Sequence, residues 1–279
     1  MFTISQLFIY PVKSLGGTPV SSVMLTDRGF QYDRRWMLID ESNQFISQRE
    51  CADMALLSAE IKKDGLSITH KKIGDNILIP FQPQITSTVM VDIWSDRCRA
   101  QVINGEADEW LSNMLSMRCK LVYMPDATRR RVDGRYAMDK EITSFSDGYP
   151  TLIIGQASLD NLNERLQHPL SIERFRPNIV FTGGEPYEED DMEIFKVNNI
   201  NFYGIKLCGR CVVININQTT GEKSKEPLRT LSTYRLRNNK IYFGQNLLHK
   251  GEGNISIGDV IDVIKKRDTI RTFSGIKTS

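Results

Sequence analysis

Two cysteines, Cys208 and Cys211, lie three positions apart, with a glycine and an arginine between them and an apolar, β-branched run after them. A thiolate is a soft metal ligand and a nucleophile, and a neighbouring guanidinium such as that of Arg210 favours the ionised form. Gly209 permits tight backbone geometry, so one sulfur could project from a turn. The residues alone leave a metal ligand, a redox pair and buried structural cysteines as alternatives.

Ligand counting argues against a structural zinc site. Such a site usually has four ligands, and the three histidines, at positions 70, 168 and 249, are isolated from one another. A thioredoxin-type dithiol should open a helix, whereas residues 212–214 are β-branched and predict a strand. A single thiolate that binds a metal carried by a cofactor needs no further protein ligand, so this alternative remains alongside two half-buried thiols.

A second set of candidate residues lies near the N-terminus. Lys13 and Ser14 occupy a turn that continues into two glycines, where an ammonium and backbone N–H groups could bind a phosphate. Arg34 adds a guanidinium that can bind an anion through two hydrogen bonds. Considered alone, Lys13 fits a solvated turn residue and Arg34 a local ion pair at least as well. Arg176 and Asn178, at the start of a predicted strand, are ambiguous in the same way.

Composition and charge describe an ordinary globular protein. A chain of 279 residues with 40% hydrophobic and 25% charged residues can bury a sizeable core. Its net charge of +2 argues against nucleic acid as a partner, and the basic segment 129–135 lacks interleaved aromatic residues. No apolar run approaches the ~18 residues that cross a bilayer, and no signal peptide is recognisable. Five dispersed cysteines predict reduced thiols, so we expect a cytoplasmic protein without a membrane segment.

Short strand patterns dominate the first hundred residues. Polar turns at residues 41–44, 63–65 and 95–97 separate apolar runs and predict three hairpins. This spacing favours a barrel or sandwich over a βαβ fold. Apolar residues at helical spacing predict one helix over residues 106–117. The fold class is therefore predicted as mainly β with packing helices.

The second half of the chain is predicted to be mainly β as well. Residues 125–150 are rich in charge, Gly and Pro and predict a loop or linker. Ser158 is the predicted N-cap of a helix, and residues 227–235 predict a short helix with proline at its first position. The acidic run at 185–193 and the basic run at 129–131 are interpreted as solvated loops.

Several candidate residues belong to a longer pattern. The N-terminal part contains Tyr-Pro-Val-Lys-Ser at 10–14 and Asp-Arg-Arg-Trp-Met-Leu-Ile-Asp at 33–40. The C-terminal part contains Phe-Arg-Pro-Asn-Ile-Val at 175–180, Cys-Gly-Arg-Cys at 208–211 and a Thr-Gly to Arg-Thr-Leu segment at 220–231. In this order, over nearly the whole chain, the motifs resemble MOSC domain proteins with an N-terminal MOSC β-barrel domain. The resemblance is greatest to mitochondrial amidoxime-reducing components and bacterial reductases of N-hydroxylated compounds.

The resemblance implies a division of the chain and a cofactor. Residues 1–120 would form the N-terminal MOSC-associated β-barrel domain, residues 121–267 the MOSC domain, and residues 268–279 a flexible tail. Members of the family bind molybdenum cofactor, which is molybdenum on molybdopterin, and reduce amidoximes, hydroxylamines and N-hydroxylated bases. The family pattern makes Cys211 the molybdenum ligand. It assigns Lys13, Ser14 and Arg34 to the pterin and its phosphate, and places Arg176, Asn178 and Arg210 near the cofactor.

The source of electrons is predicted from two departures from relatives. The chain lacks the four-cysteine set of the iron–sulfur domain that some bacterial relatives append, and it lacks the membrane anchor of eukaryotic relatives. We therefore expect a separate electron-transfer protein of the ferredoxin, flavodoxin or cytochrome type, for which residues 185–193 or 129–131 could be a docking site. The alternative function is a carrier of sulfur or cofactor that uses a Cys211 persulfide, because MOSC domains also resemble the C-terminal part of molybdenum cofactor sulfurases.

Overall fold

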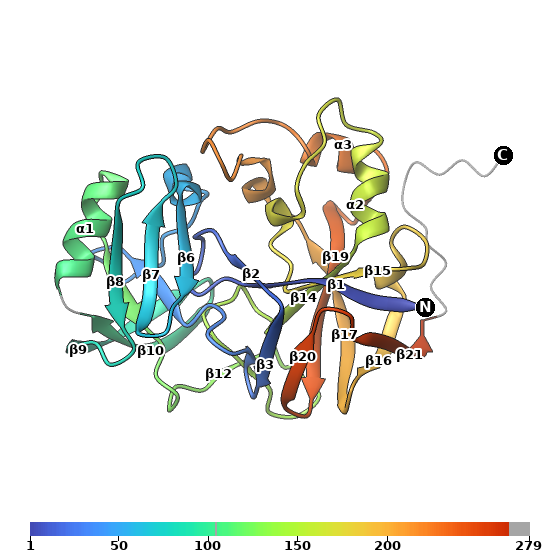
Figure 1. The fold of residues 1–279 in the computed structure, drawn as a ribbon, viewed down its shortest axis with the longest axis horizontal. Coiled ribbons are helices and arrows are strands. Elements are labelled where there is room, and N and C mark those ends of the chain that lie inside the picture. Colours follow the sequence, from blue (N-terminus) through green and yellow to red (C-terminus); the bar gives the residue numbers. More distant parts are fainter. Residues whose placement is uncertain (104, 268–279) are drawn as a thin grey trace.

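The computed structural model describes residues 1–103 and 105–267, and its centre is a closed β-barrel. The barrel closes because β14 (Thr151–Gly155) pairs with β15 (Ile179–Thr182) on one side and with β19 (Lys240–Lys250) on the other. The predicted mainly β fold with packing helices is confirmed (Figure 1). From β15 to β19 the order around the seven-stranded barrel is β1 (Phe2–Ile9), β21 (Val260–Lys266), β16 (Met192–Val197) and β17 (Ile200–Gly209).

The N-terminal strand belongs to the barrel of the C-terminal half. In Figure 1, β1 (blue) lies among the yellow, orange and red elements. Leu7 of β1 is opposite Ile179 of β15, and Phe2 is opposite Ile261 of β21, both in antiparallel pairs. Residues 10–14, which follow β1 directly, therefore begin at the barrel wall. The domain division at residues 120 and 121 stays a prediction, and residues 268–279 lie outside the described part of the chain.

Residues 36–124 build a second, smaller unit beside the barrel. Two of the three predicted hairpins and the predicted helix are confirmed, but residues 45–49 form no strand and only a single bridge, from Phe45 to Ile39. One sheet contains β5 (Trp36–Ile39), β11 (Lys120–Tyr123), β10 (Asp96–Ile103) and β9 (Ile85–Ile93) in that order. Another contains β6 (Leu57–Ile61), β7 (Gly65–His70) and β8 (Asn76–Pro80), and α1 spans Gly105–Leu115.

Shorter elements connect the two units and cover the barrel. Among the described residues, no helix is long and apolar enough to cross a membrane. The longer pieces are β2 (Thr18–Val20), β3 (Ser22–Thr26), β20 (Gly253–Ser256), α2 (Gln156–Asn163), α3 (Leu228–Ser232) and the 3₁₀ turns η1 (Ala52–Leu56), η2 (Ile172–Phe175) and η4 (Val212–Asn215). The shortest are β4 (Gly29–Phe30), β12 (Arg130–Arg131), β13 (Ile142–Thr143), β18 (Leu236–Arg237) and the turn η3 (Glu188–Asp190).

Two further local predictions are wrong, the strand at residues 212–214 and the N-cap at Ser158. In both segments a side chain is buried in the protein interior. Residues 212–214 form the 3₁₀ turn η4 instead of a strand, and Ile214 is buried. Helix α2 begins at Gln156, with Gly155 as its N-cap, so Ser158 lies inside the helix. The Ser158 hydroxyl donates to Glu189 Oε2 at 2.8 Å in the protein interior, which a hydroxyl at an exposed N-cap could not do.

The two charged runs are only in part the solvated loops that the sequence predicts, because Arg129, Arg131 and Glu185 are exposed but other members are buried. In the acidic run, Glu189 and Asp190 are 0% and 5% exposed, and Asp190 Oδ2 accepts from Arg235 Nη2 at 2.6 Å. In the basic run, Arg130 is buried and donates to Asp96 and to the carbonyl oxygen of Ser146. The buried members of each run therefore hold the fold together, and fewer charges than predicted are left to dock a partner.

The Asp190–Arg235 ion pair should be important for stability. We expect Asp190→Ala to lower the free energy of unfolding by about 3–5 kcal/mol, because it leaves the guanidinium of Arg235 buried without its carboxylate. Glu193→Ala is the control, since it breaks an exposed pair with Lys265 in the same segment and should cost about 0–1 kcal/mol. Urea unfolding followed by circular dichroism measures both values, and equal losses would contradict the assigned role of Asp190.

Candidate functional site

A cavity of about 740 Å³ collects the candidate residues from both halves of the chain. Its volume is in the range of sites for small molecules and cofactors. Segments that are almost two hundred residues apart in the sequence face one another across it. All seven residues singled out from the sequence line the cavity: Lys13, Ser14, Arg34, Arg176, Asn178, Arg210 and Cys211.

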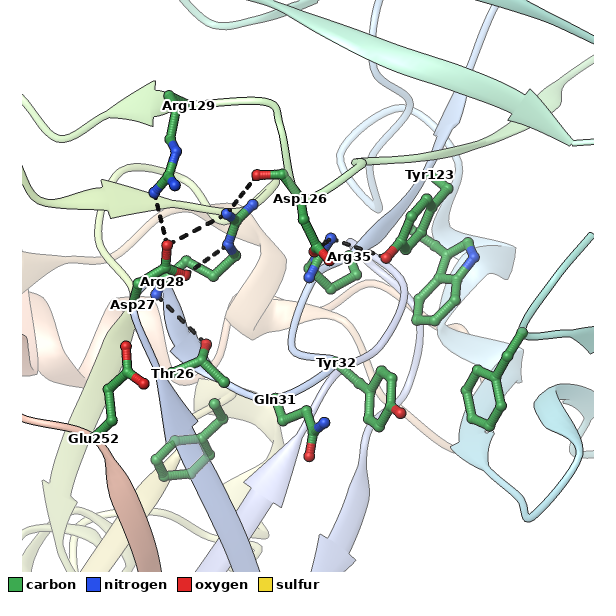
Figure 2. Close-up of a pocket in the computed structure, with 13 residues that line it drawn as sticks. Thr26, Asp27, Arg28, Gln31, Tyr32, Arg35, Tyr123, Asp126, Arg129 and Glu252 are labelled. Atoms are coloured by element: carbon green, nitrogen blue, oxygen red, sulfur yellow. Dashed lines mark hydrogen bonds and ion pairs between the residues drawn. The ribbon is translucent and has the colours of Figure 1, made fainter. Parts of the chain in front are cut away.

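A second cavity, of about 530 Å³, differs in its charge balance (Figure 2). Arg28 and Arg129 both contact the carboxylate of Asp27, and Arg35 pairs with Asp126 at 2.7 Å. Figure 2 shows dashed lines from Arg28 and Arg129 to Asp27, and with the Arg35–Asp126 pair each of the three cations contacts a carboxylate. The cations of the 530 Å³ cavity are therefore less available to an anionic ligand than those of the 740 Å³ cavity.

The 740 Å³ cavity carries a large excess of positive charge. Among its described lining residues, Asp147 is the one carboxylate. Concentrated cations in a concave site raise the local concentration of anions and hold them by charge-assisted hydrogen bonds. Eight basic residues line the cavity: Lys13, Arg34, Arg49, Arg174, Arg176, Lys206, Arg210 and Lys240.

Three of the seven candidate residues have a left-handed backbone. The φ angles are +69° at Ser14, +49° at Arg34 and +55° at Arg176. Such a conformation costs a residue other than glycine on the order of 1–3 kcal/mol and persists only where the surrounding structure enforces it. Its occurrence at three residues around one cavity is typical of a functional site. In such a site the required orientation of the side chain is kept despite the free-energy cost of the backbone conformation.

Arg34 and Arg176 are held together by Tyr10. Their guanidinium carbons lie 4.3 Å and 4.4 Å from the centre of the Tyr10 ring, so both make cation–π contacts with it. Arg34 also donates to Asp33 Oδ2 at 2.6 Å, and Arg176 donates to the carbonyl oxygen of Leu15 at 2.6 Å. Burial, reinforced by the nearby Arg34, lowers the pKa of Arg176 to about 10, which still leaves it charged at neutral pH.

Asn178 is a connector whose side chain is fully used by the protein. Its Oδ1 accepts from the backbone N–H of Leu152 at 3.2 Å and from Arg34 Nη1 at 3.1 Å. Its Nδ2 donates to the carbonyl oxygen of Phe8 at 3.2 Å. Asn178 therefore joins β1 to the start of β14 and aims Arg34, instead of offering a free amide to a ligand.

Lys13 is buried and pairs with Asp147, a residue that sequence reasoning missed. Its Nζ donates to Asp147 Oδ1 at 2.5 Å and lies 5.1 Å from the ring centre of Phe45. Burial lowers the pKa of Lys13, and the carboxylate of Asp147 opposes this shift. Trp94 Nε1 donates to the same carboxylate oxygen at 3.3 Å. Asp147 lies in the supposed linker 125–150, whose composition gives no sign that it returns to the cavity.

The cation beside Cys211 comes from Arg49 and not from its neighbour in the sequence. Arg49 Nη2 donates to Cys211 Sγ at 3.3 Å, and its guanidinium stacks 4.1 Å from the ring centre of Trp94. Arg210 instead donates to the carbonyl oxygens of Phe243 and Phe175, both at 2.8 Å. Arg210 thus gives its hydrogen bonds to the backbone, while its charge still opposes the burial that raises the pKa of Cys208. A contact across 162 residues leaves no local signal in the sequence.

Two buried polar atoms in the cavity wall lack a protein partner. Arg210 Nη2 and Thr151 Oγ1 have no hydrogen-bond partner among the described residues, although both are shielded from solvent. An unsatisfied buried donor costs about 1–3 kcal/mol, so such atoms are rare unless a ligand completes them. Arg210 therefore contributes to the cavity through the part of its guanidinium that the protein leaves unbound.

The two cysteines of the pair have different surroundings. Cys208 packs against the core cluster that contains Phe175 and Phe243, and burial raises the pKa of its thiol. Cys211 is half-buried at the cavity, next to Arg49. The pair is therefore asymmetric, and the sulfur that a ligand in the cavity can meet beside a cation is that of Cys211.

This asymmetry predicts an order of thiol reactivity. In protein dialysed free of small molecules, iodoacetamide should modify Cys211 before Cys98 and Cys119, which are buried and whose pKa is raised by burial to about 11. At pH 7.5 less than about 0.1% of the latter two would be thiolate, so their labelling should rise steeply with pH. Peptide mass spectrometry measures each rate, with Cys211→Ser as the control. Faster labelling of Cys98 or Cys119 at pH 7.5 would contradict the structure.

Comparisons with known proteins agree with the arrangement of the chain. The model of the MOSC N-terminal beta barrel domain matches residues 1–118, and the model of the MOSC domain matches residues 140–262. The chain is 31% identical to mitochondrial amidoxime-reducing component 1 of Mus musculus (93% of this chain, 81% of that protein) and of Homo sapiens (93% and 82%). It is 29% identical to the molybdenum cofactor sulfurase of Oryza sativa subsp. japonica, over 86% of this chain and 32% of that protein.

Proposed function

The chain belongs to the family of MOSC domain proteins with an N-terminal MOSC β-barrel domain, and from that premise we propose that it is a molybdenum-cofactor-dependent reductase of N-hydroxylated compounds. The observation that carries the proposal is the convergence of Cys211 with the cations of the N-terminal loop on one cavity. Two relatives similar over 93% of this chain are amidoxime-reducing components by name, which supports an amidoxime, a hydroxylamine or an N-hydroxylated base as substrate.

The residues of the cavity fit the proposed cofactor. Molybdenum in the cofactor takes soft sulfur ligands, and Cys211 offers a thiolate with Arg49 beside it. The unsatisfied Arg210 Nη2 and the excess of cations suit a ligand that carries a phosphate and many acceptor atoms. Lys13, Ser14 and Arg34 would hold the phosphate end, with Arg34 aimed by Asn178. Arg176 and Arg210 would line the pterin.

The chain contributes position and charge to the reaction. When bound, the cofactor supplies the electron and oxygen transfer that removes the hydroxyl oxygen from nitrogen. Overall, two electrons and two protons convert the N-hydroxylated compound to its parent base and water. Arg49 would hold the Cys211 sulfur in place by its hydrogen bond, and the barrel strands would keep the polar groups of the cavity in place. A separate ferredoxin-, flavodoxin- or cytochrome-type protein would deliver the electrons. A cytoplasmic location remains part of the proposal.

A carrier of sulfur or of the cofactor is the second candidate. It is favoured by the similarity to a molybdenum cofactor sulfurase, of which the chain spans about a third. A thiol at the wall of an open cavity beside a cation could take the outer sulfur of a donor persulfide, with the donor's remaining sulfur leaving as a thiolate. Under this alternative Cys211 would be the carrier atom instead of a permanent metal ligand.

The ligand role of Cys211 can be tested with a matched pair of variants. Protein made in a host with intact cofactor synthesis should contain close to one molybdenum per chain. We expect Cys211→Ala to keep less than about a tenth of it and Cys208→Ala to keep most of it, because only Cys211 presents its sulfur beside the cation of Arg49. Metal analysis by mass spectrometry, together with fluorescence of the oxidised pterin, gives both contents. Undiminished molybdenum in Cys211→Ala would contradict this assignment.

The reductase and the carrier predict different reaction products. With reduced methyl viologen as electron donor, the reductase should convert benzamidoxime to benzamidine. Cys211→Ala should lose at least about 99% of the rate, because the metal that stabilises the transition state loses its protein ligand. Chromatography measures the product. A carrier should show no turnover, and the peptide that contains Cys211 should instead gain the mass of one sulfur atom after exposure to a sulfur donor.

A further inference from the structure

Lys206 lies in the cavity wall inside a frame of two tyrosines. Its Nζ is 4.4 Å from the ring centre of Tyr136 and 5.6 Å from that of Tyr149. The two rings are perpendicular, with centres 5.9 Å apart. Lys206 Nζ also donates to the Tyr149 hydroxyl oxygen at 3.4 Å. The ammonium group is thereby kept at one place in the wall, although lysine side chains usually move freely.

The charge of Lys206 is not neutralised by the protein. Among the described residues, no carboxylate lies within 4.0 Å of its Nζ. Asp133 is close enough to feel this charge, but its Oδ2 is already bound by Arg135 Nη2 at 2.6 Å. Ring faces and a phenol are neutral partners that favour a cation without cancelling it. The ammonium is therefore available to an anionic group of a ligand.

The Tyr149 hydroxyl provides a second donor at the same place. Its oxygen accepts from Lys206, which leaves its own hydrogen free. Burial raises the pKa of Tyr149, and the carboxylate of Asp133 adds to this shift, so the phenol stays protonated at physiological pH. An ammonium and a phenol side by side match the two oxygens of one carboxylate.

The position of Lys206 separates it from the proposed phosphate-binding cations. Lys206 lies on β17 and is held by pairing with Asn246 of β19, whose Nδ2 also donates to the Lys206 carbonyl oxygen at 3.2 Å. The phosphate-binding set lies on the loops after β1 and before β5. Lys206 also precedes Cys211 by five positions in the sequence and lines the same cavity, and its charge acts on the thiol of Cys208.

We propose that Lys206 and Tyr149 form a carboxylate-recognition site for the substrate, so that the enzyme prefers planar, N-hydroxylated compounds that bear a carboxylate away from the N–O group. This inference rests on the proposed function and narrows its substrate class. The carboxylate accepts hydrogen bonds from Lys206 and from Tyr149, while the ring of the substrate lies beside the tyrosines. The remaining cations are left to the cofactor.

The test compares two substrates that differ by one carboxylate, 4-carboxybenzamidoxime and benzamidoxime, with reduced methyl viologen as donor. We expect Lys206→Met to lower kcat/KM for the carboxylate substrate by about 10- to 100-fold, chiefly through KM, because a charged hydrogen bond is lost. Turnover of benzamidoxime should change by less than about threefold, because the lost group contacts only the carboxylate.

Tyr149→Phe should also lower kcat/KM for the carboxylate substrate, by about three- to tenfold, because a neutral hydrogen bond is lost. Lys250→Met, an exposed lysine outside the cavity, should change neither substrate.

Two further measurements separate a role of Lys206 in cofactor binding from a role in substrate binding. The molybdenum and pterin contents of Lys206→Met should equal those of the unaltered protein, and a loss of either would overturn the proposal by assigning Lys206 to the cofactor. Calorimetry with 4-carbamoylbenzoate and benzamide measures recognition without turnover. Reduction of both amidoximes with no carboxylate preference overturns the recognition site and leaves the reductase. Tight 4-carbamoylbenzoate binding that depends on Lys206, without any reduction, overturns the reductase and supports the site.

Discussion

The pairing of β1 between β15 and β21 is the constraint on which the site depends. It brings Phe2–Ile9 into a barrel made otherwise of residues after 150, so that residues 10–15 start from the barrel wall. Asn178 locks this pairing, because its backbone oxygen accepts from the N–H of Phe8 at 3.0 Å while its side chain returns a hydrogen bond to the Phe8 carbonyl. Without this strand, Lys13 and Ser14 would belong to the smaller unit alone and could not face Cys211 across a cavity.

Three of the eight cations that line the cavity are held in place by other groups of the protein. Asp33 and Asn178 hold Arg34, Asp147 holds Lys13, and the Tyr10 ring lies under both Arg34 and Arg176. These contacts fix the direction of the donors before a ligand arrives, so that binding needs little reorganisation. The left-handed backbone at Ser14, Arg34 and Arg176 shows that the fold accepts local strain around this cavity.

Sequence reasoning succeeded where a property is local and failed where it depends on distant partners. Alternating apolar residues identified most strands, and short motifs identified seven of the residues that line the cavity. Arg49, Asp147 and Lys206 were missed because their partners are far away in the sequence, as in the contact from Arg49 to Cys211. Charge composition also misled: Arg130 and Asp190 look like surface residues until their buried partners are known, because composition reports polarity and not burial.

The incorrectly predicted strand at residues 212–214 explains why the two cysteines differ. A strand that continued past Gly209 would have extended the barrel wall and alternated its side chains between the two faces. Instead, β17 ends at Gly209 and η4 begins at Val212, with Cys211 as the extended residue between them. The turn sends Ile214 back into the core and leaves Cys211 at the cavity beside Arg49. The turn that follows the two cysteines thus makes them differ, because both line the cavity but only Cys211 accepts a hydrogen bond from Arg49.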